Sequence, residues 1–126
     1  MSDSVKKILV VDDEESILFA FSKILMRPHI EVHTAQTLNE ALALLQKNSY
    51  DIVIADLRLS GTANFEGFTV ITAVTETQKE CKIIVMTAYG DEKIKEKVFS
   101  LGADFYLEKP ASPQKIKELI ASMGIY

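Results

Sequence analysis

The chain has 126 residues, a net charge of −4 and 48% hydrophobic residues, which is the composition of an ordinary globular protein with one core. The acidic balance argues against direct nucleic-acid binding, and apolar runs of about five residues are too short to span a membrane. The single cysteine, Cys81, cannot form an internal disulfide, and no signal peptide is evident at the start. We therefore expect one cytoplasmic domain over residues 1–126.

Five apolar runs have the length of β-strands, and three of them are nearly continuous rather than alternating. Continuous runs are typical of parallel strands that are covered on both faces. The runs are 7–11, 30–35, 51–55, 82–86 and 103–107.

A stretch with the apolar spacing of a helix follows each run. Thr37 and Glu40 form a capping-box pattern at the start of the second stretch, and Gly102 is suited to end the fourth. Ser112 and Pro113 are a good cap and first residue for the fifth. Strand and helix thus alternate five times, which predicts a doubly wound α/β fold with a five-stranded parallel sheet and helices on both faces.

Polar residues follow four of the predicted strands. Asp12 and Asp13 follow the first, Asp56 the third, Thr87 the fourth and Lys109 the fifth. Ligands of open parallel sheets bind beyond the carboxyl ends of the strands, so we expect these side chains to converge.

Each of these residues also has a simpler explanation. The acids from Asp12 to Glu15 suit the start of a helix, and Asp56 suits a turn. Thr87 and Lys109, taken alone, read as a strand-end hydroxyl and a solvated charge. The simpler explanations do not account for such residues at four strand ends at once.

Gathered carboxylates repel one another and raise a pKa unless a cation lies between them. Mg²⁺ prefers hard oxygen ligands and leaves room for a phosphoryl oxygen. Asp56 is then a possible nucleophile that forms an acyl phosphate, with Lys109 and Thr87 contacting the phosphoryl oxygens.

Four segments resemble the CheY-like receiver domain of bacterial two-component response regulators. They are "ILVVDDEESI", "DIVIADLRL", "IIVMTAYG" and "GADFYLEKP". The resemblance implies a flavodoxin-like (βα)5 sheet with strand order 2-1-3-4-5. It makes Asp56 the phosphoacceptor, with Mg²⁺ held by Asp12, Asp13, Asp56 and the backbone carbonyl of Arg58. The phosphoryl donor would be a sensor histidine kinase or a histidine phosphotransfer protein.

The resemblance also implies how the signal leaves the site. Thr87 and Lys109 contact the phosphoryl group, and the peptide bond before Pro110 is expected to be cis. Phosphorylation draws Thr87 toward the phosphoryl group, and Tyr106 turns inward into the vacated space. The alternative is that Tyr106 is an ordinary half-buried tyrosine with a solvated hydroxyl. The output surface is the fourth helix, fifth strand and fifth helix, where a downstream domain or protein binds. This surface includes Lys93, Lys95, Tyr106 and Lys117. A phosphorylation-dependent dimer is left open.

Two features depart from the family pattern. Ser60 stands where a proline is common, and Gly67 comes later than usual, so residues 58–67 contain an insertion. Arg58 and Tyr89 flank the expected path of the attacking water, and we expect Tyr89 to slow hydrolysis of the phosphorylated form.

Two other functions compete with the phosphorylatable switch. One is a binding module of the same fold that is never phosphorylated, which would not need clustered acids. The other is a small phosphohydrolase, but the first strand is followed by "DDEE" rather than Asp-x-Asp. No Gly-rich phosphate loop is present, and His29 and His33 lack metal-ligand partners in the sequence.

Overall fold

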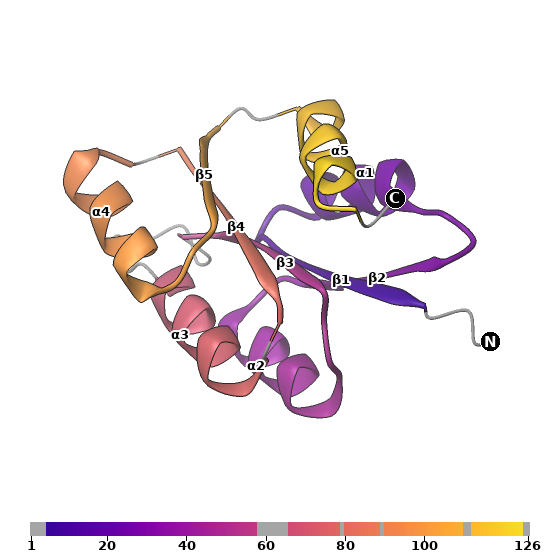
Figure 1. The fold of residues 1–126 in the computed structure, drawn as a ribbon, viewed down its shortest axis with the longest axis horizontal. Helices are drawn as coiled ribbons and strands as arrows, with labels where there is room; N and C mark the ends of the chain where they lie inside the picture. Colours follow the sequence, from indigo (N-terminus) through magenta and orange to yellow (C-terminus); the bar gives the residue numbers. More distant parts are fainter. Residues whose placement is uncertain (1–4, 58–65, 79, 89, 110–111, 125–126) are drawn as a thin grey trace.

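The computed structural model describes residues 5–57, 66–78, 80–88, 90–109 and 112–124. Strands and helices alternate along the whole described chain (Figure 1). The elements are β1 (Lys6–Val11), α1 (Glu15–Leu25), β2 (Ile30–Ala35), α2 (Leu38–Lys47), β3 (Ile52–Asp56), α3 (Gly67–Thr77), β4 (Lys82–Thr87), α4 (Glu92–Leu101), β5 (Phe105–Glu108) and α5 (Pro113–Ser122).

The five strands form one sheet in the order β2-β1-β3-β4-β5, and every neighbouring pair is parallel. The fold class and strand order expected from the sequence are confirmed. The central strand β3 pairs with β1 on one side and β4 on the other, with Ala55 opposite Val11 and Asp56 opposite Met86. The carboxyl ends of these three strands therefore lie together at one edge of the sheet.

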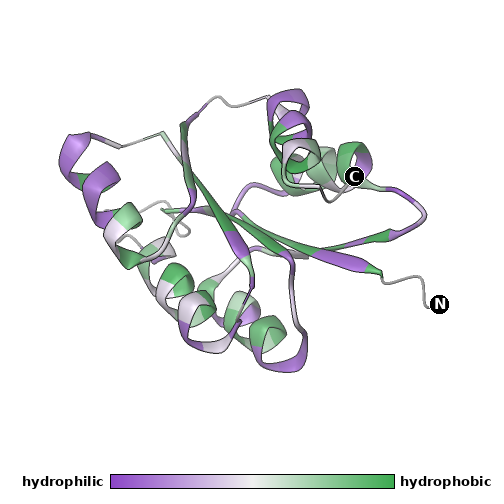
Figure 2. Ribbon diagram, in the orientation of Figure 1, coloured by the Kyte–Doolittle hydropathy of each residue, from purple (hydrophilic) through white to green (hydrophobic). Residues whose placement is uncertain are grey.

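Helices cover both faces of the sheet, with α1 and α5 on one face and α2, α3 and α4 on the other (Figure 1). Alternate residues of each strand enter the two cores, as the pleat of a strand requires. Leu9 and Val53 pack under α2 and α3, whereas Ile8 and Ile54 pack under α1 and α5. Figure 2 shows the apolar residues concentrated on the strands and on the helix sides that face them. This double coverage explains the continuous apolar runs.

The predicted helix boundaries are largely confirmed. The Thr37 side chain accepts a hydrogen bond from the Glu40 N–H at 3.1 Å, although the Glu40 carboxylate binds the N–H of Gln36 rather than that of Thr37. Ser112 caps α5 through its side chain, and Gly102 ends α4 with a φ of 120°. Asp91, which the sequence pattern did not single out, caps α4.

Two predicted strands begin later than expected because an aspartate precedes each of them. The Asp51 carboxylate accepts the N–H of Lys7 at 2.9 Å, and the Asp104 carboxylate accepts the N–H of Ile83 at 2.8 Å. These side chains satisfy donors at the amino ends of neighbouring strands, so they extend the ladder without belonging to it.

The helix α3 approaches the end of β3 closely at Gly67. Its N–H donates to the carbonyl of Leu57 at 2.9 Å. A Cβ at this position would lie 2.6 Å from both the Asp56 carbonyl oxygen and the Leu57 Cα. Only glycine fits this contact, which holds α3 against the strand that carries Asp56. Most of the predicted insertion, residues 58–65, lies outside the described residues. Among the described helices, none has the length and apolar content to cross a membrane.

Candidate functional site

Three carboxylates gather at the carboxyl edge of the sheet. Asp12 and Asp13 follow β1, and Asp56 ends β3. Each side chain offers one oxygen, and these oxygens lie within 4.8 Å of one another. Asp12 is 0% exposed and Asp56 is 5% exposed, so two of the three acids are buried. The expected convergence of these residues is confirmed.

Local hydrogen bonds fix the position of Asp12. Its backbone N–H donates to the Ala35 carbonyl at 3.0 Å, which continues the β1–β2 ladder by one residue. Its Oδ1 accepts the N–H of Glu14 at 2.9 Å, which turns the chain toward α1. The side chain of Glu14, which occupies the cap position, makes no capping hydrogen bond. Helix capping by this acid therefore does not explain the run of carboxylates.

Lys109 supplies the positive charge at this edge. Its Nζ lies 2.8 Å from Asp12 Oδ2 and 2.9 Å from Asp56 Oδ2, so it bridges two strands. Its backbone N–H donates to the Thr87 carbonyl at 2.9 Å, which ties the end of β5 to the end of β4. Burial alone would lower the pKa of Lys109, but the hydrogen bonds and charges of Asp12 and Asp56 outweigh it and raise that pKa.

One ammonium does not neutralise the whole cluster. The pKa of Asp13 is raised, first by burial and then by the charge of Asp12, with a smaller contribution from Glu14. Lys109 offsets part of this effect. A divalent cation fits the donor set, because the three groups are carboxylate oxygens and Mg²⁺ binds such oxygens at about 2.0–2.1 Å. Asp12, Asp13 and Asp56 could therefore bind a divalent metal.

The hydroxyl predicted from the sequence also lies at this edge. Thr87 ends β4 and is 0% exposed. Behind it, Tyr106 of β5 points inward, and its hydroxyl is buried with no hydrogen-bond partner among the described residues. A Cβ on Gly90 would lie 1.5 Å from the Tyr106 hydroxyl oxygen and 2.9 Å from the Thr87 methyl carbon. Gly90, which the sequence pattern did not single out, thus leaves the space that Tyr106 fills.

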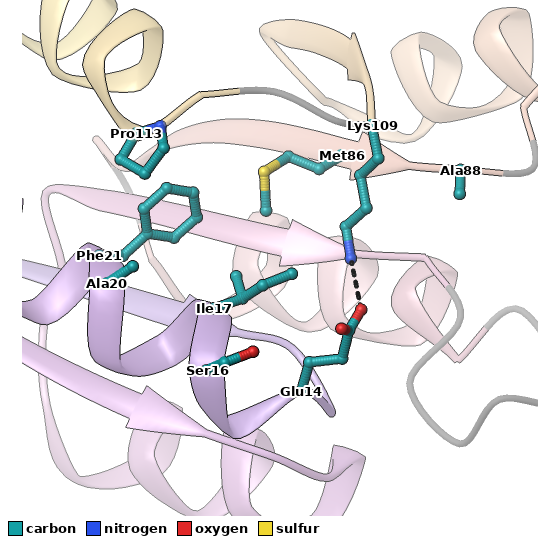
Figure 3. Close-up of a pocket in the computed structure, with 9 residues that line it drawn as sticks. All are labelled: Glu14, Ser16, Ile17, Ala20, Phe21, Met86, Ala88, Lys109 and Pro113. Atoms are coloured by element: carbon teal, nitrogen blue, oxygen red, sulfur yellow. Dashed lines mark ion pairs between the residues drawn. The ribbon is translucent and has the colours of Figure 1, made fainter.

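A hollow of about 510 Å³ borders the cluster on the side of α1 and α5 (Figure 3). Lys109 and Glu14 stand at its charged end, 3.9 Å apart between Nζ and Oε1. Its other walls are mainly apolar and come from α1, β4 and the start of α5. No sequence pattern predicted this hollow, because its lining comes from distant segments.

Some residues with predicted roles fall outside the described ranges. They are Arg58, Ser60, Tyr89 and Pro110, so the roles expected for them stay predictions.

The histidines have no role in the carboxylate cluster. His33 Nδ1 lies 2.7 Å from the Tyr50 hydroxyl, and its Nε2 lies 2.5 Å from Glu31 Oε2. Within the described ranges, neither His29 nor His33 belongs to a group of three potential metal ligands.

Comparisons with known proteins agree with this geometry. The family described as "Response regulator receiver domain" matches residues 8–121. The transcriptional regulatory protein SrrA of Staphylococcus aureus (strain NCTC 8325 / PS 47) is 36% identical over 110 residues, covering 87% of this chain and 44% of SrrA. The chain thus spans less than half the length of that relative.

Solved structures of receiver domains are also similar. A CheY-like receiver domain from Methanospirillum hungatei JF-1 has a TM-score of 0.86 at 29% identity, covering 95% of this chain and 94% of that one. The BeF3-activated DrrB receiver domain has a TM-score of 0.82 at 27% identity, covering 97% and 99%. A Burkholderia pseudomallei response regulator, solved with a phosphorylated aspartic acid, calcium ion and citrate, has a TM-score of 0.79 at 27% identity, covering 95% and 74%.

The fold, the acidic pocket and these matches lead to one assignment. A receiver domain implies a histidine kinase partner, and phosphorylation-dependent switching is typical of the family. The chain belongs to the response regulator receiver domains, which are signalling modules of two-component systems rather than catalytic enzymes.

Proposed function

We propose that this domain is a phosphoaspartate switch. Asp56 accepts a phosphoryl group from a histidine kinase or a histidine phosphotransfer protein, in the presence of Mg²⁺, and the surface formed by α4, β5 and α5 then changes. The observation that carries this proposal is the meeting of Asp12, Asp13, Asp56 and Lys109 at the carboxyl edge of the sheet.

The reaction at Asp56 needs positioning and charge neutralisation. A carboxylate oxygen of Asp56 forms a bond to phosphorus, and the bond from phosphorus to the donor imidazole breaks. Asp12, Asp13, Asp56 and the backbone carbonyl of Arg58 would hold Mg²⁺, which supplies positive charge to the phosphoryl oxygens. Lys109 already touches Asp56 Oδ2, so its ammonium is positioned to pair with a phosphoryl oxygen.

The switch runs from Thr87 to Tyr106. The Thr87 hydroxyl would donate a hydrogen bond to a phosphoryl oxygen, which fixes the space beside Tyr106. The Tyr106 hydroxyl is buried against Gly90. Phosphorylation would favour this inward position of the tyrosine. Arg58 and Tyr89 would tune the hydrolysis that resets the switch.

The output surface is supported by the contacts around Tyr106. The Nζ of Lys95 lies 5.9 Å from the centre of the Tyr106 ring, so a side chain of α4 contacts the tyrosine. The Lys93, Lys95 and Lys117 side chains would meet a downstream domain or protein, or a second copy of the domain. SrrA is named a transcriptional regulatory protein, so a transcriptional output of a longer protein is part of this proposal.

The direct test is incubation with Mg²⁺ and acetyl phosphate, followed by intact mass spectrometry. We expect a gain of one phosphoryl group that Asp56→Asn abolishes. Asp51→Asn, at the opposite end of β3, is the matched control and should keep the adduct. A protein that forms no adduct and binds no beryllofluoride would be a binding module of the same fold. Release of phosphate without an adduct at Asp56 would indicate a phosphohydrolase.

A further inference from the structure

The sheet has an open edge at β2. This strand ends the strand order, and no other strand among the described residues pairs with it on its outer side (Figure 1). The carbonyl of Ala35 accepts the N–H of Asp12 at 3.0 Å, so the backbone of Ala35 faces β1. Because backbone groups alternate in direction along a strand, those of Val32 and Thr34 face away from the sheet. A further strand could satisfy these donors and acceptors.

The edge lacks most of the features that keep natural edge strands from pairing. Such strands commonly contain a lysine, a proline or a bulge. Ile30–Ala35 contains neither lysine nor proline, and it pairs with β1 without a break in register. Its charged residue, Glu31, binds the neighbouring His33 Nε2 through Oε2 at 2.5 Å. The outward-facing positions are uncharged and β-branched, which suits them to a strand pair.

The helix α1 extends this edge with an exposed apolar surface. Phe19 is 65% exposed, and Met26, which follows α1, is 57% exposed. Because about two helical turns separate them, both lie on one side of α1. Phe19 and Ser22 line a hollow of about 370 Å³ together with Thr34 of β2. The apolar side of α1 therefore adjoins the open edge of the sheet.

The charges on this side of α1 are ordered by sign. Glu15, Phe19 and Lys23 follow one another at helical spacing, so they form one stripe. Glu15 stands at the acidic end, where it lines the same hollow as Glu40. Lys23 stands in the last turn, with its Nζ 5.3 Å from the centre of the Phe19 ring. The stripe is thus acidic at one end, apolar in the middle and basic at the other.

Such an order is complementary to itself when it is reversed. A two-fold axis reverses the direction of α1, so the acidic end of one copy meets the basic end of the other. A partner that ran parallel to α1 would instead set carboxylate beside carboxylate. With Val32 on the axis, Glu31 of one copy lies opposite His33 of the other, so like charges do not face each other between the strands.

We propose that two copies of this domain pair through their β2 edges, antiparallel about a two-fold axis, with the Phe19 sides of α1 against each other. The pair joins two sheets into one. β2 and β5 lie at opposite edges of the sheet, so the surface formed by α4, β5 and α5 stays open in the pair (Figure 1). The association therefore requires no phosphorylation of Asp56.

The first test is sedimentation equilibrium from low micromolar to near-millimolar protein, without Mg²⁺ or a phosphoryl donor. The average mass should rise from 14.1 kDa toward that of a dimer. Phe19→Asp should weaken the association roughly tenfold or more, because a charge replaces the central apolar contact. Phe99→Asp is the matched control. Phe99 is an exposed aromatic residue of α4, so this variant should associate like the wild type.

A charge exchange tests the antiparallel arrangement. Glu15→Lys and Lys23→Glu should each weaken the association roughly tenfold, because like charges then meet at two symmetric places. The double variant restores opposite charges and should associate like the wild type. Lys115→Glu, on α5, is the control and should change nothing. All of these side chains are exposed, so the variants should fold, and circular dichroism checks this.

Amide hydrogen exchange tests the strand pairing. The N–H groups of Val32 and Thr34 should exchange more slowly at high protein concentration than at low concentration. Phe19→Asp should remove this difference. The comparison distinguishes pairing through β2 from a contact between helices alone, which would leave these amides unprotected.

Several results would overturn the proposal. One is a mass that stays at 14.1 kDa at every concentration. Another is association that persists in Phe19→Asp, or that the double charge exchange does not restore. Unchanged exchange at Val32 and Thr34 in the associated protein would rule out the strand pair. Association only with Mg²⁺ and beryllofluoride would place the contact on the output surface instead.

Discussion

At the scale of single residues, the carboxylate cluster places two opposing demands on the domain. Asp13 is needed to hold a divalent cation in the proposed function, yet burial and the Asp12 charge raise its pKa. At a pH above its raised pKa, such a carboxylate is ionised in the folded protein, and this lowers the free energy of unfolding. The loss disappears as the pH falls through the raised pKa, because the folded protein then takes up the proton.

We therefore expect Asp13→Asn to stabilise the metal-free protein. At neutral pH the melting temperature should rise by about 2–4 °C, and the gain should shrink as the pH is lowered through the raised pKa of Asp13. Glu15→Gln removes a nearby exposed charge and serves as the control. Equal melting temperatures for Asp13→Asn and the wild type would show that Asp13 carries no such cost.

Two tyrosine hydroxyls provide a second prediction at this scale. The Tyr106 hydroxyl has no partner among the described residues, whereas the Tyr50 hydroxyl lies 2.7 Å from His33 Nδ1. Tyr106→Phe should raise the free energy of unfolding by about 1 kcal/mol, because a buried unsatisfied hydroxyl is removed. Tyr50→Phe should lower it by about 1 kcal/mol, because a hydrogen bond is lost. Urea denaturation measures both. Two changes of the same sign would contradict the described environment of Tyr106.

At the scale of elements, the site depends on how closely α3 approaches β3. Gly67→Ala would place a Cβ 2.6 Å from backbone atoms of Asp56 and Leu57, which cannot move aside as a side chain end can. We expect a loss of about 1–3 kcal/mol in the free energy of unfolding and a slower reaction at Asp56, because the end of β3 must shift. Thr69→Ala, on the exposed side of the same helix, is the control. Unchanged stability and phosphorylation rate for Gly67→Ala would show that the contact is not required.

At the scale of the whole molecule, the carboxyl ends of β1, β3 and β5 bring three carboxylates and one ammonium together, so the site is net acidic. Repulsion among the carboxylates lowers the free energy of unfolding. A divalent cation that binds the folded protein and not the unfolded chain should therefore raise its melting temperature. We expect stabilisation at millimolar Mg²⁺ that Asp12→Asn and Asp13→Asn each weaken. Calorimetry with MgCl2, against NaCl at the same ionic strength, separates binding from screening. A melt insensitive to Mg²⁺ would count against the metal site.

Much of the fold was predictable from the sequence, because its signals are local. Covered parallel strands need continuous apolar runs, and those of β1, β3 and β4 are evident in the chain. Caps such as Thr37 and Ser112 act within one turn of their helices, so they too are visible locally. Such local signals do not specify the order of the strands in the sheet. The resemblance to receiver domains implies that order, and the pairing of the strands confirms it.

The carboxylates of the site were predictable for a related reason: parallel strands bring their carboxyl ends to one edge, so Asp12, Asp13 and Asp56 had to converge once the strands were identified. Tertiary structure alone decided how the negative charges of these carboxylates are offset, with Lys109 Nζ between Asp12 and Asp56. It also decided that Gly90 leaves room for Tyr106, and that α1 and α5 leave an apolar hollow beside the site. These features arise from side chains far apart in the chain, and no local pattern encodes the distances between them.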